Sequence, residues 1–366
     1  MRIDSFVYNL ATDKYTGSIA NLIKVFLYIL SLIYELIVRI LILLYRVRPY
    51  KLNCKVISIG NITMGGTGKT TLVEFVARYL KQKGHKVAIL SRGYKRKDAG
   101  RPAYRQAERT QDASCETMGD EPYMLFKNLG DVPVLVDANR IRAAKLAIKD
   151  YSVDTVILDD GFQQWKIKKD LDILAIDAAN PFGNKHLIPR GILREPLSSL
   201  KRSDVFILTK TDLNPDTQDI EDFLIQIKPS AAVIESIHRP LGFYNIDKPS
   251  ELLSTDILKD KAVALISGIA DPVSFENLIM NLGVKIGLSL RFADHHYYTQ
   301  RDLENITKES QGKNIDTIIT TEKDAVRLKQ LQAASCKLQV MVLRIELKIT
   351  KNEERFLNRL LKLYSV

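Results

Sequence analysis

The chain has little cysteine: Cys54, Cys115 and Cys336 are the only three in 366 residues. Their number is odd and they are scattered, so they fit neither a disulfide framework nor the spacing of zinc ligands. This pattern favours a reducing compartment, and we expect all three thiols to be packing residues.

The sequence also lacks an RNA-binding aromatic motif and a helix-turn-helix signature, so nucleic acid ranks low as a partner. The formal charge is nevertheless +11, which implies another anionic partner, such as a nucleotide, a phosphorylated substrate or a membrane surface. With 46% apolar and 27% charged residues, the composition is that of an ordinary globular protein, and we expect no bulk disorder. The length favours two domains.

The longest apolar stretch, residues 18–48, is not free of charge. A continuous helix over it would be roughly 45 Å long, but Lys24, Glu35 and Arg39 interrupt it, so it is not a clean spanning segment. It is too long for a cleaved signal peptide, and no small-residue cleavage site follows.

The charges of this stretch lie together on a helical wheel. At about 100° per residue, Lys24, Glu35, Arg39 and Arg46 fall within roughly 60° of one another. A narrow polar stripe on an apolar helix is typical of a segment in the membrane interface, with the stripe toward protein or water. Basic residues follow at 46–55, as expected on the cytoplasmic side. The alternative is a long core helix of a soluble protein.

A phosphate loop follows the apolar stretch. Residues 56–60 read as a buried strand, residues 65–70 spell Gly-Gly-Thr-Gly-Lys-Thr, and a helical pattern begins at Leu72. Glycines let backbone N–H groups surround phosphate oxygens, and the helix N-terminus favours the same anion. Lys69 can reach the β- and γ-phosphates, and the hydroxyl of Thr70 can ligate Mg²⁺. The sequence therefore predicts a nucleotide site, which consists of Met64, Gly65, Gly66, Thr67, Gly68, Lys69, Thr70 and Thr71.

The loop departs from the standard pattern, because Thr63 stands where its first glycine would be. The glycine pair is typical of ParA/MinD-type loops, but those carry a lysine just before the pair. Here that position is Met64, which disfavours a ParA-like ATPase.

Acidic residues mark two further positions. Residues 155–160 read as a buried strand that ends in Asp159 and Asp160, the arrangement of the aspartate that holds Mg²⁺ in phosphate-loop NTPases. Asp120 and Glu121 precede a helical pattern, and on sequence physics alone they read as a helix cap and a first-turn acid.

Several basic segments follow predicted strands. Arg92 comes after the strand 87–91, and Arg194 lies in a loop rich in Gly, Pro and cations; either could meet a phosphate, or be a solvated surface cation. Residues 209–212, Thr-Lys-Thr-Asp, are weakly similar to the base-reading motif of GTPases. Near residue 235 the pattern resets and a second βαβ series begins, which contains His295, His296 and a charged cluster at 321–324.

Taken together and in order, these motifs resemble one family, the tetraacyldisaccharide 4′-kinases of lipid A biosynthesis. The resemblance covers nearly the whole chain and includes 119–122 (Gly-Asp-Glu-Pro), 158–163 (Leu-Asp-Asp-Gly-Phe-Gln), 193–197 (Leu-Arg-Glu-Pro-Leu) and 294–296 (Asp-His-His). Thr71 departs from it, since the family often has proline there.

The resemblance implies an α/β fold of two α/β/α domains with the site between them. We expect residues 1–50 to form the membrane-associated helix, 51–235 a phosphate-loop kinase domain with a parallel sheet, and 236–366 a smaller domain that closes over the site. The implied reaction is ATP- and Mg²⁺-dependent phosphorylation of the 4′-hydroxyl of the lipid A disaccharide precursor, giving lipid IVA. The implied place is the cytoplasmic face of the inner membrane of a Gram-negative-type bacterium.

The resemblance also implies residue roles. Asp120 becomes the general base, paired with His295 or His296, of which we favour His295; this replaces the cap interpretation. The acids expected to serve the metal are Asp159, Asp160 and Glu195, beside Thr70. Substrate contacts are expected from Arg92, Tyr94 and Arg194.

Two other functions fit parts of the sequence. A membrane-tethered regulatory GTPase or ATPase switch would explain residues 209–212 and predicts a preference for GTP. A soluble small-metabolite kinase would make residues 18–48 a core helix. The oligomeric state does not follow from the sequence.

Overall fold

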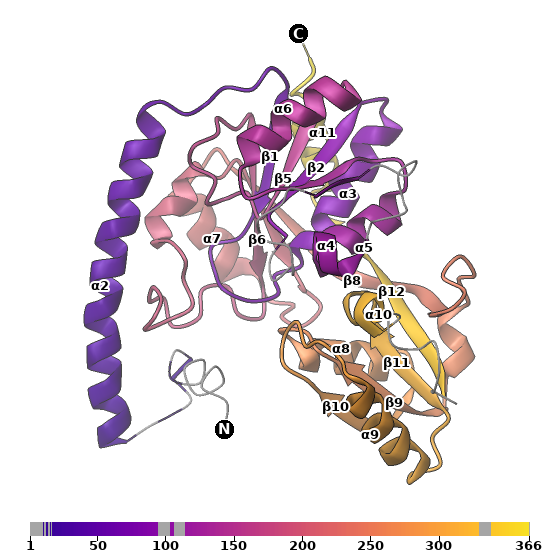
Figure 1. The fold of residues 1–366 in the computed structure, drawn as a ribbon. Coiled ribbons are helices and arrows are strands. Elements are labelled where there is room, and N and C mark those ends of the chain that lie inside the picture. Colours follow the sequence, from indigo (N-terminus) through magenta and orange to yellow (C-terminus); the bar gives the residue numbers. More distant parts are fainter. Residues whose placement is uncertain are drawn as a thin grey trace. The chain divides into compact units, whose positions relative to one another are not determined.

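The structure is a computed structural model. It describes residues 10, 12–13, 15, 17–93, 103–105, 114–328 and 338–365. Within these ranges the chain alternates helices and strands (Figure 1), and the expected α/β class is confirmed. The helices are α2 (Ser18–Val47), α3 (Lys69–Gln82), α4 (Cys115–Met118), α5 (Asp120–Leu129), α6 (Arg140–Tyr151), α7 (Gln218–Ile227), α8 (Pro272–Asn281), α9 (Gln300–Gln311), α10 (Glu322–Leu328) and α11 (Glu353–Leu361), with 3₁₀ turns η2 (Leu197–Arg202) and η3 (Thr255–Leu258). The strands are β1 (Lys55–Gly60), β2 (Val87–Ser91), β3 (Ala103–Arg105), β4 (Val134–Val136), β5 (Thr155–Asp159), β6 (Leu171–Asp177), β7 (Val205–Thr209), β8 (Ala232–Asn245), β9 (Ala262–Ser267), β10 (Lys285–Arg291), β11 (Thr317–Thr321) and β12 (Gln339–Lys351).

The chain divides into two compact units. The first comprises residues 1–90, 139–237 and 348–366, and the second comprises residues 91–138 and 238–347. The expected linear boundaries, 51–235 and 236–366, differ from this division at two places. Residues 91–138 group with the second unit, and the last 19 residues return to the first.

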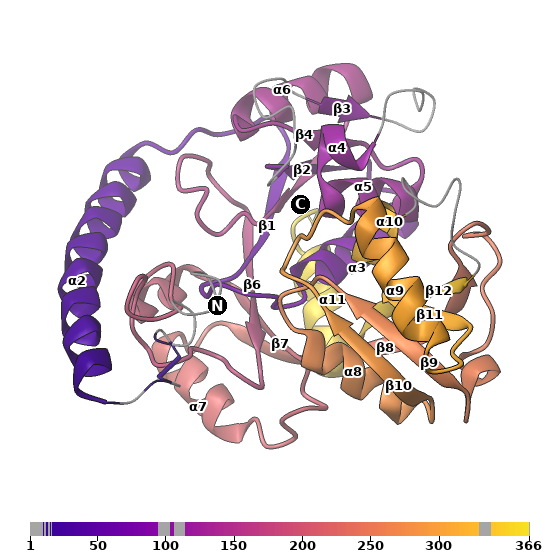
Figure 2. The ribbon, with the colours of Figure 1, turned by 60° about the horizontal axis from the view of Figure 1, so that its bottom comes forward.

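The first unit is built on parallel strands. β1 pairs with β5 on one side and β6 on the other, β5 also pairs with β2, and β6 continues through β7 to β8. These strands are buried and apolar, as expected for a parallel sheet covered on both faces. On one side, Phe75 of α3 stacks on Phe356 of α11, with ring centroids 6.2 Å apart; α3 and α11 lie side by side in Figure 2. The strand register places Ile59 beside Asp159, so the ends of β1 and β5 meet.

The second unit has two cores, one on each face of its parallel strands β10, β9, β11 and β12. Alternate residues of β9 enter different cores. Ala264 and Ile266 pack with α9 and α10, whereas Val263 and Leu265 pack with α8. This alternation follows from the two-residue period of a strand and produces three layers.

The N-terminal apolar stretch forms one helix, α2, drawn in indigo in Figure 1. Its length and composition are sufficient to cross a membrane. Only Ser31 and Val38 are buried, and fifteen large apolar side chains between Ile19 and Val47 are exposed. The helix is therefore not a core helix, and the buried positions lie on the same side as the charged stripe.

The end of β1 requires glycine. A Cβ atom on Gly60 would lie 2.6 Å from the backbone nitrogen and the Cβ of Phe162. Because neither atom can move independently of the backbone, we expect Gly60→Ala to lower the free energy of unfolding by about 1–3 kcal/mol. Urea denaturation followed by circular dichroism measures this. Gly312→Ala is the control, since its Cβ would lie 3.4 Å or more from any neighbour, and its effect should stay within about 0.5 kcal/mol. Equal effects of the two substitutions would contradict the steric argument.

Candidate active-site residues

The phosphate loop connects β1 to α3. Gly65 and Gly68 have φ angles of +116° and +73°, a region that costs glycine little and other residues more. Gly68 caps α3, and Lys69 and Thr70 are the first two residues of this helix. The sequence-predicted strand, loop and helix are therefore all present.

Backbone contacts brace this loop. The N–H of Met64 donates to the carbonyl of Ile192 at 2.7 Å, and the N–H of Arg194 donates to the carbonyl of Ile62 at 2.7 Å. On the other side, the hydroxyl of Thr209, the last residue of β7, donates to the carbonyl of Thr67 at 3.1 Å. The first residue of the Thr-Lys-Thr-Asp segment thus supports the phosphate loop.

Asp160 lies beside the loop in a left-handed conformation, with φ of +53°. Its two carboxylate oxygens accept hydrogen bonds of 2.8 and 2.9 Å from the guanidinium of Arg194, and Lys69 Nζ lies 3.7 Å from Oδ1. Burial raises the pKa of Asp160, but Lys69 and Arg194 outweigh burial and lower it to about 2. Asp160 is therefore ionised at any pH near neutrality.

The other two predicted metal acids differ in their surroundings. Asp159 is buried at the end of β5. Glu195 is fully buried, and its carboxylate accepts hydrogen bonds from Arg202 at 2.7 and 3.1 Å, and from Gln163 and Trp165 at 3.1 Å each. A direct bond from Glu195 to a metal would require some of these donors to be displaced.

Helix α2 contacts the segment that braces the phosphate loop. The Ser31 hydroxyl donates to the carbonyl of Leu187 at 2.8 Å and accepts the N–H of Arg190 at 3.0 Å. The Tyr34 hydroxyl donates to the carbonyl of Arg194 at 2.9 Å. The same arginine therefore connects α2, through its backbone, to Asp160, through its side chain.

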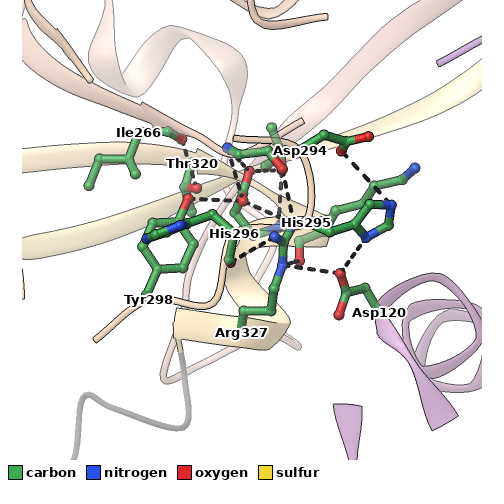
Figure 3. A network of polar contacts seen from close by, with 12 residues as sticks. Asp120, Ile266, Asp294, His295, His296, Tyr298, Thr320 and Arg327 are labelled. Atoms are coloured by element: carbon green, nitrogen blue, oxygen red, sulfur yellow. Dashed lines mark hydrogen bonds and ion pairs between the residues drawn. The ribbon is translucent and has the colours of Figure 1, made fainter. Parts of the chain in front are cut away.

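In the second unit, Asp120 and His295 meet although 175 residues separate them (Figure 3). Nδ1 of His295 lies 2.9 Å from Oδ2 of Asp120. His296 has a different partner, since its Nε2 lies 3.0 Å from Oδ2 of Asp302. The structure thus brings His295, and not His296, to Asp120. Asp120 is the first residue of α5 and its side chain makes no capping hydrogen bond, so the cap interpretation is not supported.

Two further groups contact Asp120, and neither was predicted to. The thiol of Cys115 donates to Oδ1 at 2.8 Å, and Nε of Arg327 lies 3.3 Å from Oδ2. Burial raises the pKa of Asp120, but the hydrogen bond from His295, the charge of Arg327 and the Cys115 thiol together hold it below its usual value. Burial and the nearby carboxylate raise the pKa of Cys115, which keeps it a neutral donor and gives it more than the packing role we expected.

Two of the three predicted substrate residues, Arg92 and Arg194, lie within the described part of the chain. Arg194 is paired with Asp160, as described. Arg92 follows β2 and is exposed. Tyr94 lies outside the described residues. No sequence signal pointed to Arg327 except its position three residues after Asp324 on α10, a spacing at which side chains of a helix meet.

The model of the tetraacyldisaccharide-1-P 4′-kinase family (LpxK) matches residues 23–364. The chain belongs to this family. It is similar to the tetraacyldisaccharide 4′-kinase of Halothermothrix orenii (36% identity, 98% of both chains) and to that of Elusimicrobium minutum (36% identity, 90% of this chain and 89% of the other).

A solved structure is similar over almost the whole chain. LpxK from Aquifex aeolicus, crystallised in complex with ATP, is 29% identical, covers 94% of this chain and 100% of its own, and superposes with a TM-score of 0.75. Family membership confirms the resemblance drawn from the motifs, and the chain is an ATP-dependent kinase of the phosphate-loop class. The regulatory switch is not favoured.

A substitution of Glu195 can distinguish a structural role of this residue from a role as a metal ligand. Removing one charge of a buried pair leaves the other uncompensated, so Glu195→Gln should lower the free energy of unfolding by about 3–5 kcal/mol. Thermal melts in the absence of Mg²⁺ measure this. Glu74→Gln breaks an i,i+4 pair with Arg78 at the surface of α3 and should cost about 0.5 kcal/mol or less. An unchanged melting temperature of Glu195→Gln, with weakened Mg²⁺-dependent nucleotide binding, would assign Glu195 to the metal instead.

Proposed function

We propose that this kinase transfers the γ-phosphoryl group of ATP to the 4′-hydroxyl of the tetraacylated glucosamine disaccharide 1-phosphate precursor of lipid A, giving lipid IVA. The observation that carries the residue-level proposal is the Asp120–His295 pair, an ionised carboxylate within 2.9 Å of an imidazole. The family and the phosphate loop supply the nucleotide half of the reaction.

Residues 64–71 are proposed to hold the triphosphate. Two buried polar atoms near the loop support this: Thr67 Oγ1 and Asn61 Nδ2 have no hydrogen-bond partner in the part of the chain that the structure describes. A buried donor without a partner costs free energy unless a ligand satisfies it. Lys69, the first residue of α3, would place its ammonium against the β- and γ-phosphates.

The residues present also fit Mg²⁺, which prefers oxygen ligands and keeps several waters and phosphate oxygens in its shell. Thr70 and Asp159 supply a hydroxyl and a buried carboxylate, with Asp160 beside them and Glu195 as a further candidate. Among the described residues no group of three or more His, Cys, Asp and Glu could hold a metal. Bound Mg²⁺ would neutralise charge on the phosphate oxygens.

Asp120 is the proposed general base. Because its carboxylate is ionised, Nδ1–H of His295 donates to Oδ2, which orients the carboxylate toward an incoming hydroxyl. The sugar hydroxyl loses its proton to Asp120 as its oxygen attacks the γ-phosphorus of ATP, and the bond from that phosphorus to the β-phosphate oxygen breaks to release ADP. We propose that the second unit closes over the nucleotide to bring this pair to the acceptor, and that Arg92, Tyr94 and Arg194 contact the substrate.

The exposed face of α2 is proposed to lie in the cytoplasmic leaflet of the inner membrane. The charged stripe and the contacts of Ser31 and Tyr34 occupy one side of the helix. Phe26, Ile33 and Leu44 lie on the opposite side and are 60%, 53% and 62% exposed. Burying that face in lipid would contribute roughly 25 cal/mol per Å² of apolar area, and it would bring the lipid substrate to the enzyme.

The first experiment is phosphate transfer from labelled ATP to the purified lipid A precursor in detergent micelles. Asp120→Asn should lower kcat by roughly 10²–10⁴-fold, the usual contribution of a general base. His295→Ala removes a group that lowers the pKa of Asp120 while burial, which raises it, remains. The acidic limb of the pH–kcat profile should therefore move to higher pH.

His296→Ala is the matched control, because its side chain contacts Asp302 and not Asp120, and its profile should stay at the wild-type position. A His295→Ala profile that coincides with that of His296→Ala would refute the proposed pairing. Undiminished transfer by Asp120→Asn would remove Asp120 from the role of base.

The membrane proposal is tested by sedimentation with anionic phospholipid vesicles. Replacing Phe26, Ile33 and Leu44 together by Gln should release most of the protein into the supernatant, because their apolar area no longer gains from burial in lipid. The control replaces Leu252, Val273 and Met280, which are 48%, 49% and 51% exposed in the second unit, and should still sediment. Equal sedimentation of both variants would show that α2 is not the anchor.

A further inference from the structure

Arg327 of α10 is buried between two carboxylates, and its role follows from what it contacts. Its side chain is 3% exposed. Nε lies 3.3 Å from Oδ2 of Asp120, and Nη2 lies 3.1 Å from Oδ1 of Asp324. A guanidinium remains charged at any accessible pH, so this is a fixed positive charge beside the proposed base.

The same guanidinium holds the backbone around His295. Nη1 donates to the carbonyl of His296 at 2.9 Å, and Nη2 donates to the carbonyl of Gly268 at 3.3 Å. That Gly268 carbonyl also accepts the N–H of His295 at 3.0 Å. His295 has a φ of +59°, a conformation that costs a non-glycine residue free energy and persists only where the surroundings enforce it.

Asp324 fixes the arginine in turn. Its side chain is fully buried and accepts the hydroxyl of Tyr298 at 2.9 Å, the hydroxyl of Thr321 at 2.7 Å and the N–H of Gly268 at 3.1 Å to each oxygen. Figure 3 shows this network converging on Arg327 and continuing to Asp120. Two residues of the charged cluster at 321–324, Thr321 and Asp324, therefore support this network.

We propose that Arg327, anchored by Asp324, is a positioning residue that fixes Asp120 and His295 in one geometry and sets the pH below which the base stops working. The inference rests on the proposed role of Asp120. The groups that face Asp120 are the Cys115 thiol from α4, the His295 imidazole and the Arg327 guanidinium from α10, and Asp294 lies 3.9 Å from Nε2 of His295. Among these, Arg327 is the one permanent cation.

Arg327 thus has two properties that substitutions can separate. One is its positive charge, and the other is the planar set of N–H donors on its guanidinium group. Lysine keeps the charge but cannot bond the carbonyls of Gly268 and His296 in the same way. Glutamine keeps a donor but loses the charge. A residue with only a structural role would affect folding stability and leave the pH profile in place.

The test measures pH–kcat profiles of the full chain with Arg327→Lys and Arg327→Gln. Arg327→Gln should move the acidic limb upward by about one pH unit or more, as expected when an opposite charge within contact distance is removed. Arg327→Lys should leave the limb near its wild-type position but lower kcat by roughly tenfold or more, since small misplacements of a catalytic group are costly. Equal limbs for wild type and Arg327→Gln would overturn the proposal.

A milder pair covers the case in which these variants do not fold. Tyr298→Phe removes one donor from Asp324 and should lower kcat several-fold with little effect on the KM for ATP. Tyr244→Phe, in the same core cluster, should leave kcat unchanged. Loss of stability without a fall in kcat for Tyr298→Phe would assign the network a structural role alone.

An activity-free measurement separates this inference from the proposed function. The imidazole signals of His295 can be recorded by NMR in wild type and Arg327→Lys, with His295→Ala to assign them. Changed imidazole chemical shifts in Arg327→Lys, which report a changed geometry of the ring, support the positioning role even if no lipid substrate is phosphorylated. Identical signals in the two proteins would refute it whether or not the kinase reaction is confirmed.

Discussion

A carboxylate that a fold buries loses most of its hydration, so it must take cations and donors from neighbouring elements. That demand determines many of the contacts in both units of this chain. Asp160 takes Arg194 and Lys69, Glu195 takes Arg202, and Asp120 takes His295 and Arg327. In most of these pairs the partner comes from a distant part of the sequence. These acids therefore connect separate segments of the chain and are also candidates for chemical roles. The contacts that stabilise each carboxylate also fix the orientation of its side chain.

In both units, candidate functional residues lie at the carboxyl ends of parallel strands. Parallel strands leave their polar termini at one edge of the sheet, where the next residues can gather. In the first unit, β1 and β5 end side by side and continue into the phosphate loop and the acids at 159 and 160. In the second, β9 and β11 also pair, and they continue into Gly268 and Asp324, which hydrogen-bond each other. One edge is suited to an anion, and the other supports the Asp120–His295 pair, for which we propose the role of general base and partner imidazole.

Local sequence patterns were sufficient to predict those structural features that are determined by residues close together in the sequence. The phosphate loop, the strand before Asp159 and the long helix over residues 18–47 follow from periodicity, glycine positions and composition, and the structure has them. Asp120 and His295 could be paired only through the resemblance to a family, because residues 175 positions apart carry no local sign of contact. Strand β12 and helix α11, which returns to the first unit, were not expected. Cys115 was expected only to pack, and Arg327 was indicated by nothing except its spacing from Asp324, because the role of a single thiol or arginine depends on the groups that the fold places beside it.

The hydrogen bonds of Ser31 and Tyr34 give α2 a structural role in the first unit. They end on a backbone segment that is itself bonded to the phosphate loop, and on the residue that pairs with Asp160. A shortened protein without residues 1–48 would therefore lose more than the proposed lipid-facing surface of α2. It would also lose contacts that support the segment beside the phosphate loop, so its residual activity in detergent could not be interpreted as the activity of an intact catalytic domain.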